Sequence, residues 1–586
     1  MSREHLILCG PPGSRRAPPK SRGGGKTVLL DVTPDSGNLH LRVHDITRRM
    51  AADLPPVVHD LVEISSYVFG GDQALYRGDE DGLDYGRRWR RRLRFDVPVR
   101  CPDVWRRDAV TGELVRTLSF LSDDDYEFTF RPVRKATPFP SYLEFGDEAA
   151  AADVEEVMLF SGGLDSLAGA CEEVLDNARK VALVSHRPVT KLDSRQWRLV
   201  SDLRDRAGPT VPAPFHVPVL VSQRGTAARE YTQRTRSFLF ASFAAAVATM
   251  LDRRRIRFYE NGVVSCNLPI CAQVLGGRAS RTTHPRVLAG FERLFRLILD
   301  PSFVIENPFL WRTRTDIING VRAAGHARLI AGSVSCAHTI AAETDRPHCG
   351  ICSQCVDRRL AAMAAGLTDL EDPPERYRVK LFTDRLDRVK EQTMVERIIG
   401  TAREVLAIPG PAEFLRRFGE ASRLLGQLPG PPDQNARKLL KLHRDHADEI
   451  TGVVERELNA RFRVGRWHDL PPTCLLRMLA GRAAEAAAPP ADGLLAAAYP
   501  FPEFTPDAID WAIIQALLAS PTTMDQSEIE AETGVRGNRV SRRTIGTRLR
   551  ELRRLKIVDR PKGDRGGEHL TPMGRAFAMS KLPKAG

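Results

Sequence analysis

A glycine-rich turn at residues 159–166, with the sequence LFSGGLDS, constrains the fold of this chain more than any other segment. Residues 157–160 form a short apolar run typical of a buried strand, and apolar residues from Leu164 onward recur at helical spacing. Glycines in such a turn let backbone amides approach an anion, and the positive end of the following helix attracts it. The sequence therefore predicts a strand, a phosphate-binding turn and a helix within an α/β domain.

The complete pattern SGGxDS is far more specific than a bare SGG, which most often marks an ordinary strand-to-helix turn. It resembles the signature of the PP-loop ATP pyrophosphatases, which bind the pyrophosphate of ATP and adenylate a substrate oxygen. The resemblance implies an ATP site and a catalytic role for Asp165 and Ser166, with Asp165 as the candidate Mg²⁺ ligand. The ATP-binding residues predicted here are Phe160, Ser161, Gly162, Gly163, Leu164, Asp165 and Ser166.

A cluster of cysteines follows later in the chain, in the pattern SCAH…HCGICSQC. Its spacing fits a tetrahedral zinc ion with no open coordination position. The alternative is a redox role for the CxxC pairs, and His338 or His348 could replace a thiolate. Because four cysteines are available, the predicted zinc ligands are Cys336, Cys349, Cys352 and Cys355.

The two motifs together, with Asp357, Arg358 and Arg359 soon after the last cysteine, resemble the QueC family of 7-cyano-7-deazaguanine synthases. The resemblance covers about residues 155–367. It implies ATP-dependent activation of the carboxylate of 7-carboxy-7-deazaguanine, amide formation with ammonia, dehydration to a nitrile, and a structural zinc. The long gap between the first two cysteines departs from the short housekeeping enzymes, so amide, nitrile and macromolecular conjugate all remain possible products.

Strands and helices alternate between the motifs, as in a doubly wound parallel-sheet domain. A strand at 180–184 ends at Ser185, which we expect near the nucleotide. Residues 237–251 form an apolar helix that is too short to span a bilayer and is expected in the core. The candidate substrate-binding residues follow strand ends or precede helices, and they are Arg236, Asn261, Thr283 and His284. For Arg236, a solvated helix end is an equally good interpretation.

The fold predicted for the whole chain is an α/β PP-loop core with a structural zinc site and three flanking parts. The expected divisions are a disordered tail at 1–26, an α+β domain at 27–150, the QueC-like domain at 151–371, a helical region and linker at 372–500, and a winged helix at 501–586. In the N-terminal domain we expect strands at 28–31, 39–43, 93–99, 114–120 and 126–131, with a helix inside 45–69.

Basic residues concentrate near the C-terminus. The chain has a net charge of +13, and residues 536–565 hold twelve Lys or Arg against three Asp or Glu. Helices expected at 507–518, 526–533 and 542–555, then two short strands around a Gly-rich wing, predict a winged helix that binds DNA, although such units also dock proteins. The helix at 542–555 should present Arg542, Arg543, Arg548, Arg550 and Arg553 outward.

A second basic run, RRWRRRLR at 87–94, is better explained as a strand with one solvated face than as a nucleic-acid site. The absence of a long apolar segment predicts a cytoplasmic protein without a membrane partner.

Flanking domains exceed what a housekeeping synthase needs, and QueC relatives enlarged in this way occur in anti-phage gene cassettes. The expected function is an ATP- and Mg²⁺-dependent ligase that acts on a 7-deazaguanine carboxylate, with ammonia or a protein supplying the amine. The expected partners are a deazapurine, a protein acceptor or defence-complex partner, and nucleic acid. Two alternatives remain: a PP-loop enzyme that modifies tRNA, and a nucleotide-sensing DNA-binding protein.

Overall fold

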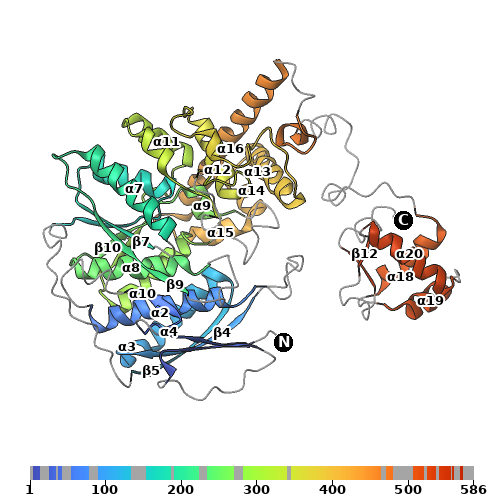
Figure 1. Ribbon diagram of the computed structural model, residues 1–586, viewed down its shortest axis with the longest axis horizontal. Coiled ribbons are helices and arrows are strands. Elements are labelled where there is room, and N and C mark those ends of the chain that lie inside the picture. The colour runs from blue at the N-terminus through green and yellow to red at the C-terminus, as the bar shows by residue number, and fades with distance from the viewer. Residues whose placement is uncertain are drawn as a thin grey trace. The chain divides into compact units, whose positions relative to one another are not determined.

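The computed structural model forms two compact units, Met1–Gly481 and Arg482–Gly586, which are described separately. It describes residues 4–12, 25–33, 37–42, 54–77, 90–133, 153–186, 190–223, 234–268, 281–338, 345–463, 470–479, 506–520, 524–535, 540–555, 557–559 and 568–571. The first unit contains two parallel sheets and a helical region, and the second is a small α/β unit (Figure 1).

The sheet that follows the glycine-rich motif has five parallel strands in the order β11-β10-β6-β7-β8. The chain runs outward from β6 to β8 and then returns to place β10 on the other side of β6. Parallel sheets bind ligands beyond the carboxyl ends of their strands, at the point where the strand order reverses. That point lies between β6 and β10. The strands are β6 (Glu156–Leu159), β7 (Val181–His186), β8 (Phe215–Val219), β10 (Arg255–Arg257) and β11 (Val304–Glu306).

Both faces of this sheet are buried, which explains its continuous apolar strands. Val157 and Leu159 pack into one core cluster with helix α8 (Arg236–Met250), whereas Met158 packs into another on the opposite face. The prediction of an α/β domain with a parallel sheet and a buried apolar helix is confirmed. The helices of the second face are α6 (Leu164–Ala170), with a π-helical turn at Cys171–Asp176, α7 (Thr190–Ala207), α11 (Arg314–Ala323) and α12 (Ser353–Ala364).

The N-terminal part forms a second parallel sheet in the order β2-β1-β4-β5. Its strands are β1 (Glu4–Cys9), β2 (Thr27–Leu30), β4 (Arg92–Val99) and β5 (Asp125–Pro132), and its helices are α2 (Pro56–Ala74), α3 (Pro102–Trp105) and α4 (Asp108–Ser122). A short antiparallel pair joins β3 (Leu39–Leu41) to β9 (Val221–Gln223).

Two predictions for this part are wrong. The tail expected to be disordered contains β1, whose apolar residues are buried between β2 and β4. The strand expected at 114–120 lies inside α4, because the buried residues Val110, Leu114, Leu118 and Leu121 recur every three to four positions, the spacing of a helix.

The two sheets are joined through their helices. Helix α2 packs against α8, and α4 packs against α10 (Pro285–Ile298) (Figure 1). The second pair approaches so closely that a Cβ atom at Gly290 would lie 2.3 Å from Oγ1 of Thr117. The first unit therefore stacks sheet, paired helices and sheet through continuous packing.

Charged residues also bridge these layers. Arg77 and Arg91 are buried between the carboxylates of Asp72 and Asp124, and Asp72 accepts hydrogen bonds at 3.1 Å from the amide and the hydroxyl of Thr235 at the start of α8. Arg91 belongs to the basic run, so at least this arginine is part of the core.

The helical region of the first unit packs on α12 and on α9 (Gly262–Cys266). It consists of α13 (Val389–Ala407), α14 (Pro411–Arg417), α15 (Gly419–Leu425) and the long α16 (Pro432–Arg463). Val356 and Leu360 of α12 lie in its core cluster, whereas Ala361 of the same helix lies in the core of the large sheet. Helix α12 is thus shared by both parts.

The second unit contains α18 (Ala508–Ala519), α19 (Gln526–Val535) and α20 (Arg542–Arg554), followed by β12 (Val558–Asp559) paired antiparallel with β13 (His569–Leu570). Ile545, Leu549 and Leu552 of α20 are buried in the core of this unit, and Leu555 packs partly buried against it. The expected wing lies largely outside the described residues. Among the helices that the structure describes, none is long and apolar enough to cross a membrane.

Candidate functional site

A pocket of about 220 Å³ opens where the strand order of the large sheet reverses. Its walls come from the turn after β6, the residues after β10, and the starts of α8, α11 and α12. The predicted residues Ser161, Gly162, Gly163, Leu164, Asp165, Ser166 and Arg236 all line it.

The glycine-rich turn is held open by short-range and long-range hydrogen bonds. Gly162 has a φ of +80°, a backbone conformation that favours glycine. Ser166 donates to the carbonyl of Gly163 at 3.1 Å, and the amide of Leu164 donates to the hydroxyl of Ser335 at 3.1 Å. The amide of Val334 donates to the carbonyl of Gly162 at 3.0 Å. The segment that precedes Cys336 therefore supports the turn from outside the motif.

Asp165 is buried beneath this turn and makes a bidentate ion pair with Arg314, with both N–O distances at 3.0 Å. It also accepts from the side-chain amide of Asn261 at 2.8 Å and from its backbone amide at 3.2 Å. Although burial alone would raise the pKa of Asp165, the guanidinium of Arg314 keeps it well below its usual range. With four hydrogen bonds on its two oxygens, Asp165 positions its neighbours, and coordinating Mg²⁺ would require it to exchange partners.

Glu260 follows β10 and lies beside this pair, where its Oε1 accepts from Arg314 at 3.2 Å. Burial and the neighbouring Asp165 carboxylate raise the pKa of Glu260 well above its ordinary value. Arg314 also donates to Asp357 of α12. Three carboxyl groups, those of Asp165, Glu260 and Asp357, thus face the single guanidinium of Arg314. Glu260 lines the pocket and offers the more available carboxylate for a divalent cation.

Arg236 stands across the pocket at the first position of α8, with its guanidinium 5.1 Å from the centre of the Phe240 ring. Its Nε atom is buried and has no hydrogen-bond partner among the described residues. Burial lowers the pKa of Arg236 to about 10. Arg236 as a whole is partly exposed, but a buried donor without a partner is costly unless an acceptor such as an anion binds it.

Two predicted ATP residues support the pocket without lining it. Ser185 is buried and donates to the carbonyl of Phe160 at 2.7 Å, and His216 lies 3.0 Å from its hydroxyl. Phe160 is also buried, and its ring meets that of His216 edge-on. Both residues fix the end of β6, and their contact with ATP stays a prediction.

The four predicted substrate residues separate into two groups. Arg236 lines the pocket. Asn261 is buried and supports it through its hydrogen bonds to Asp165. Thr283 and His284 line neither this pocket nor the larger one described below. The ring of His284 accepts from the amide of Arg286 as the cap of α10 and packs edge-on against Phe120 of α4. The structure thus gives His284 a role in helix packing.

The four predicted zinc ligands converge, with all four Sγ atoms within 4.8 Å of one another. A tetrahedral zinc with bonds of about 2.3 Å to sulfur places its ligands about 3.8 Å apart, and the Sγ atoms of Cys349 and Cys355 are 3.8 Å apart. The amide of Cys352 donates to Sγ of Cys349 at 3.3 Å. His348 instead stacks on Tyr377. The geometry fits a metal held by four thiolates, and zinc is the ion that such a set favours.

Several residues of the site have no motif in the sequence. Arg314 and Glu260 line the pocket, as do Gln196, Ser335 and Gln354. One local signal was available for Arg314: Thr313 and Asp316 form a capping box, which fixes the residue after Thr313 in the first turn of α11. Its partners at the ends of other strands depend on the tertiary fold.

No protein-family model, curated protein or solved structure matches this chain. Its function is therefore argued from the geometry of the pocket and the sequence motifs.

Replacing Cys352 by Ser should remove the metal, because three thiolates and a hydroxyl bind zinc far more weakly. We expect the zinc content to fall from about one ion per chain to near zero and the melting temperature to drop, since metal binding is coupled to folding. Metal analysis and thermal unfolding measure both quantities. Cys101→Ser, at a partly exposed cysteine outside the cluster, is the control and should change neither. Retention of zinc by Cys352→Ser would contradict the assignment.

Replacing His284 by Asn should reduce the acid sensitivity of the first unit. Burial lowers the pKa of His284 to about 3, whereas an unfolded histidine titrates near pH 6.5. Below about pH 6.5 the unfolded chain therefore binds the extra proton, and stability falls by about 1.4 kcal/mol per pH unit. Asn keeps a good helix cap but does not titrate. Urea unfolding at pH 7 and pH 5.5 should show a smaller loss in the variant, and an equal loss would contradict this role.

Proposed function

We propose that the chain binds ATP at the glycine-rich turn and transfers its adenylyl group to a substrate carboxylate, releasing pyrophosphate. One observation carries the proposal: the turn lies at the switch point of a parallel sheet and opens on a pocket in which Arg236 has an unsatisfied buried donor. Polyphosphate suits the amides at a helix start and a cation on the opposite wall.

The proposed chemistry depends on positioning and charge. The carboxylate oxygen attacks the α-phosphorus, the bond to the bridging oxygen breaks, and pyrophosphate leaves with the electron pair. Arg236 and the backbone amides of the turn would stabilise the negative charge that develops on the phosphoryl oxygens. The ion pair between Asp165 and Arg314 would fix the turn relative to the ends of β6 and β10. Glu260 and Asp165, which line the pocket, are the carboxylates that would hold Mg²⁺, and the ion would supply positive charge to the leaving pyrophosphate.

The substrate proposal comes from the resemblance to the QueC family. It makes the carboxylate that of a 7-deazaguanine and the product an amide, a nitrile or a conjugate, in an anti-phage defence system. The converging thiolates support the resemblance, because they occur at the spacing on which it rests. The four sulfurs leave no coordination position for substrate, so the proposed zinc is structural.

Arg236→Gln tests the nucleotide assignment. We expect pyrophosphate release from MgATP, with 7-carboxy-7-deazaguanine present, to fall by about 10²-fold, because a charge stabiliser of the transferring group is lost. Arg198→Gln is the matched control, since this exposed arginine lies on α7 outside the pocket. Reactions with plain tRNA and with no carboxylate separate the alternatives. Stimulation by tRNA alone would favour the tRNA-modifying enzyme, and release at the wild-type rate in Arg236→Gln would contradict the proposal.

We further propose that the second unit is a winged helix that binds DNA through α20. Arg543 and Arg550 project exposed side chains from this helix, whereas Arg542 and Arg548 make ion pairs with acidic residues of the same unit. Exposed arginines on one helix suit the phosphates and base edges of a major groove.

Replacing Arg543 and Arg550 together by Gln should weaken DNA binding by the full chain. Each lost phosphate contact lowers the slope of log K against log salt by about 0.9, so the double variant should lose about two units if both arginines contact phosphates. Fluorescence anisotropy with duplex DNA at several salt concentrations measures the slope. Arg437→Gln with Lys441→Gln, on the exposed face of α16, is the control. An unchanged slope in the α20 variant would favour a protein-docking role.

A further inference from the structure

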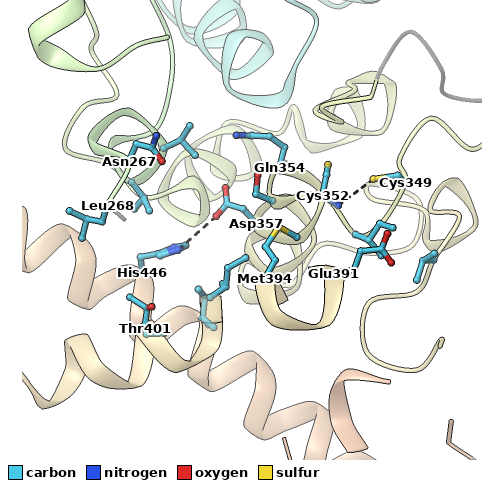
Figure 2. A pocket seen from close by; sticks show the side chains of 18 of the residues that line it. Asn267, Leu268, Cys349, Cys352, Gln354, Asp357, Glu391, Met394, Thr401 and His446 are labelled. Carbon is cyan, nitrogen blue, oxygen red and sulfur yellow. Dashed lines mark hydrogen bonds and ion pairs between the residues drawn. The ribbon is translucent and has the colours of Figure 1, made fainter. Parts of the chain in front are cut away.

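A second and larger pocket, of about 940 Å³, lies between the α/β domain and the helical region. One wall comes from α9, α12 and the cysteine loop, and the other from α13 and α16. Figure 2 shows His446 of α16 directed at Asp357 of α12, and Thr401 and Met394 of α13 also line the cavity. Pockets of this size hold molecules much larger than a single small nucleophile.

This second pocket adjoins the nucleotide pocket. Gln354 lines both, and Arg314 of the nucleotide pocket ion-pairs with Asp357 of the second pocket. Asp357 also faces His446, whose Nε2 lies 3.8 Å away, so Arg314, Asp357 and His446 form a row from one pocket to the other. The two pockets are therefore separated by little more than one layer of side chains.

The lining of the second pocket combines both charges with apolar surface. Asp357 and His446 lie at the end nearest the nucleotide pocket, and arginines 378, 385 and 388 with Glu391 also line it. The body between them includes Met394, Ile398 and Ile450. Arg385 pairs with Asp387, which also lines the pocket, and Arg388 lies 3.9 Å from Glu391. Arg378 has no ion pair among the described residues and suits an anionic group, whereas Asp357 and His446 suit an amine.

One buried group in this pocket lacks a partner. His443 is 5% exposed and stacks on Phe414, and its Nε2 atom has no hydrogen-bond partner in the described part of the chain. Burial lowers the pKa of His443 to about 3, so the ring is neutral and offers one unsatisfied nitrogen. A buried polar atom without a partner indicates an absent ligand or water.

We infer that this second pocket binds the amine that attacks the activated carboxylate, and that this amine belongs to a short peptide-like zwitterion. The inference deepens the proposed adenylation and rests on it. Ammonia is about the size of water, which occupies about 30 Å³, and it would leave the cavity and its charged lining unused. A peptide would place its amine beside Asp357, its apolar side chains against α13 and its carboxylate near the arginines.

The step balances without an external oxidant or reductant. The nitrogen lone pair attacks the carboxyl carbon of the adenylate and forms the C–N bond. The bond from that carbon to the phosphate oxygen breaks, and AMP leaves with the electron pair. Before the attack, the ammonium of the zwitterion gives one proton to the imidazole of His446, which lies beside the carboxylate that binds the amine, and this frees the lone pair. After the attack, the second proton passes from the nitrogen to the phosphate of the departing AMP.

Filling the cavity tests the inference. Thr401→Trp places a large ring in the second pocket without touching the nucleotide pocket, and Arg403→Trp, on an exposed position of the same helix, is the control. His443→Phe keeps the stacked ring and removes both ring nitrogens, including the unpartnered Nε2. The full chain is supplied with MgATP and 7-carboxy-7-deazaguanine, together with ammonium, hydroxylamine, the tripeptide Ala-Leu-Leu or its C-terminal amide.

Hydroxylamine is small and traps an adenylate as a hydroxamate, so it reports adenylation by itself. We expect the tripeptide conjugate to form at least about tenfold faster than the ammonium product at equal concentration, and the tripeptide amide to react more slowly because it lacks the carboxylate. Thr401→Trp and His443→Phe should lower only the tripeptide reaction. Mass spectrometry identifies each product.

The failures are distinguishable. An absent hydroxamate in the wild type defeats the proposed adenylation. A normal hydroxamate with no preference for the tripeptide over ammonium overturns the inference alone, as does an equal loss of hydroxamate in Thr401→Trp. Calorimetric binding of the tripeptide, lost in Thr401→Trp and retained in Arg403→Trp, tests the pocket without ATP, and absence of binding to the wild type overturns it.

Discussion

The buried guanidinium of Arg314 is the interaction on which the site depends. It binds Asp165 of the phosphate turn, Glu260 after β10 and Asp357 of α12, and so joins three segments that are far apart in the sequence. Removing one member of such a group leaves an uncompensated charge out of water, which costs more free energy than the pair contributes. Neutralising Asp165 would therefore disturb the fold as well as the chemistry, whereas Arg236 reports on the nucleotide with less structural consequence.

This arrangement also explains why the site can combine rigidity with high charge. The sheet fixes the ends of β6 and β10, the segment before Cys336 supports the turn, and the thiolate cluster holds that segment in place. Each support is a different kind of interaction: backbone pairing, hydrogen bonding and proposed metal coordination. A glycine-rich turn held from three directions would need little reorganisation to bind the proposed phosphate.

Local pattern predicted much of this structure. The apolar run before Ser161, the helix expected at 237–251 and the four cysteines were all predicted, because strand burial, helix burial and metal spacing each leave a periodic or spaced signature. Residues 114–120 were predicted as a strand but lie within α4, because a short apolar segment suits either structure until its packing partners are known. His284 appeared suited to bind a purine, yet its ring caps a helix, because a polar loop before a helix start serves both purposes equally well. Arg314 and the larger pocket were not predicted, since both arise only when distant segments meet.

The hydrogen bonds from Thr235 to Asp72 connect the N-terminal part of the first unit to the start of α8. Thr235 directly precedes Arg236, so a side chain from the first quarter of the chain anchors the backbone that presents Arg236 to the pocket beside the glycine-rich turn. The same carboxylate neutralises Arg77 and Arg91, and its loss would leave both buried. The N-terminal part thus supports the pocket from outside its walls, and a fragment that begins at the glycine-rich domain would lack the anchor of Arg236.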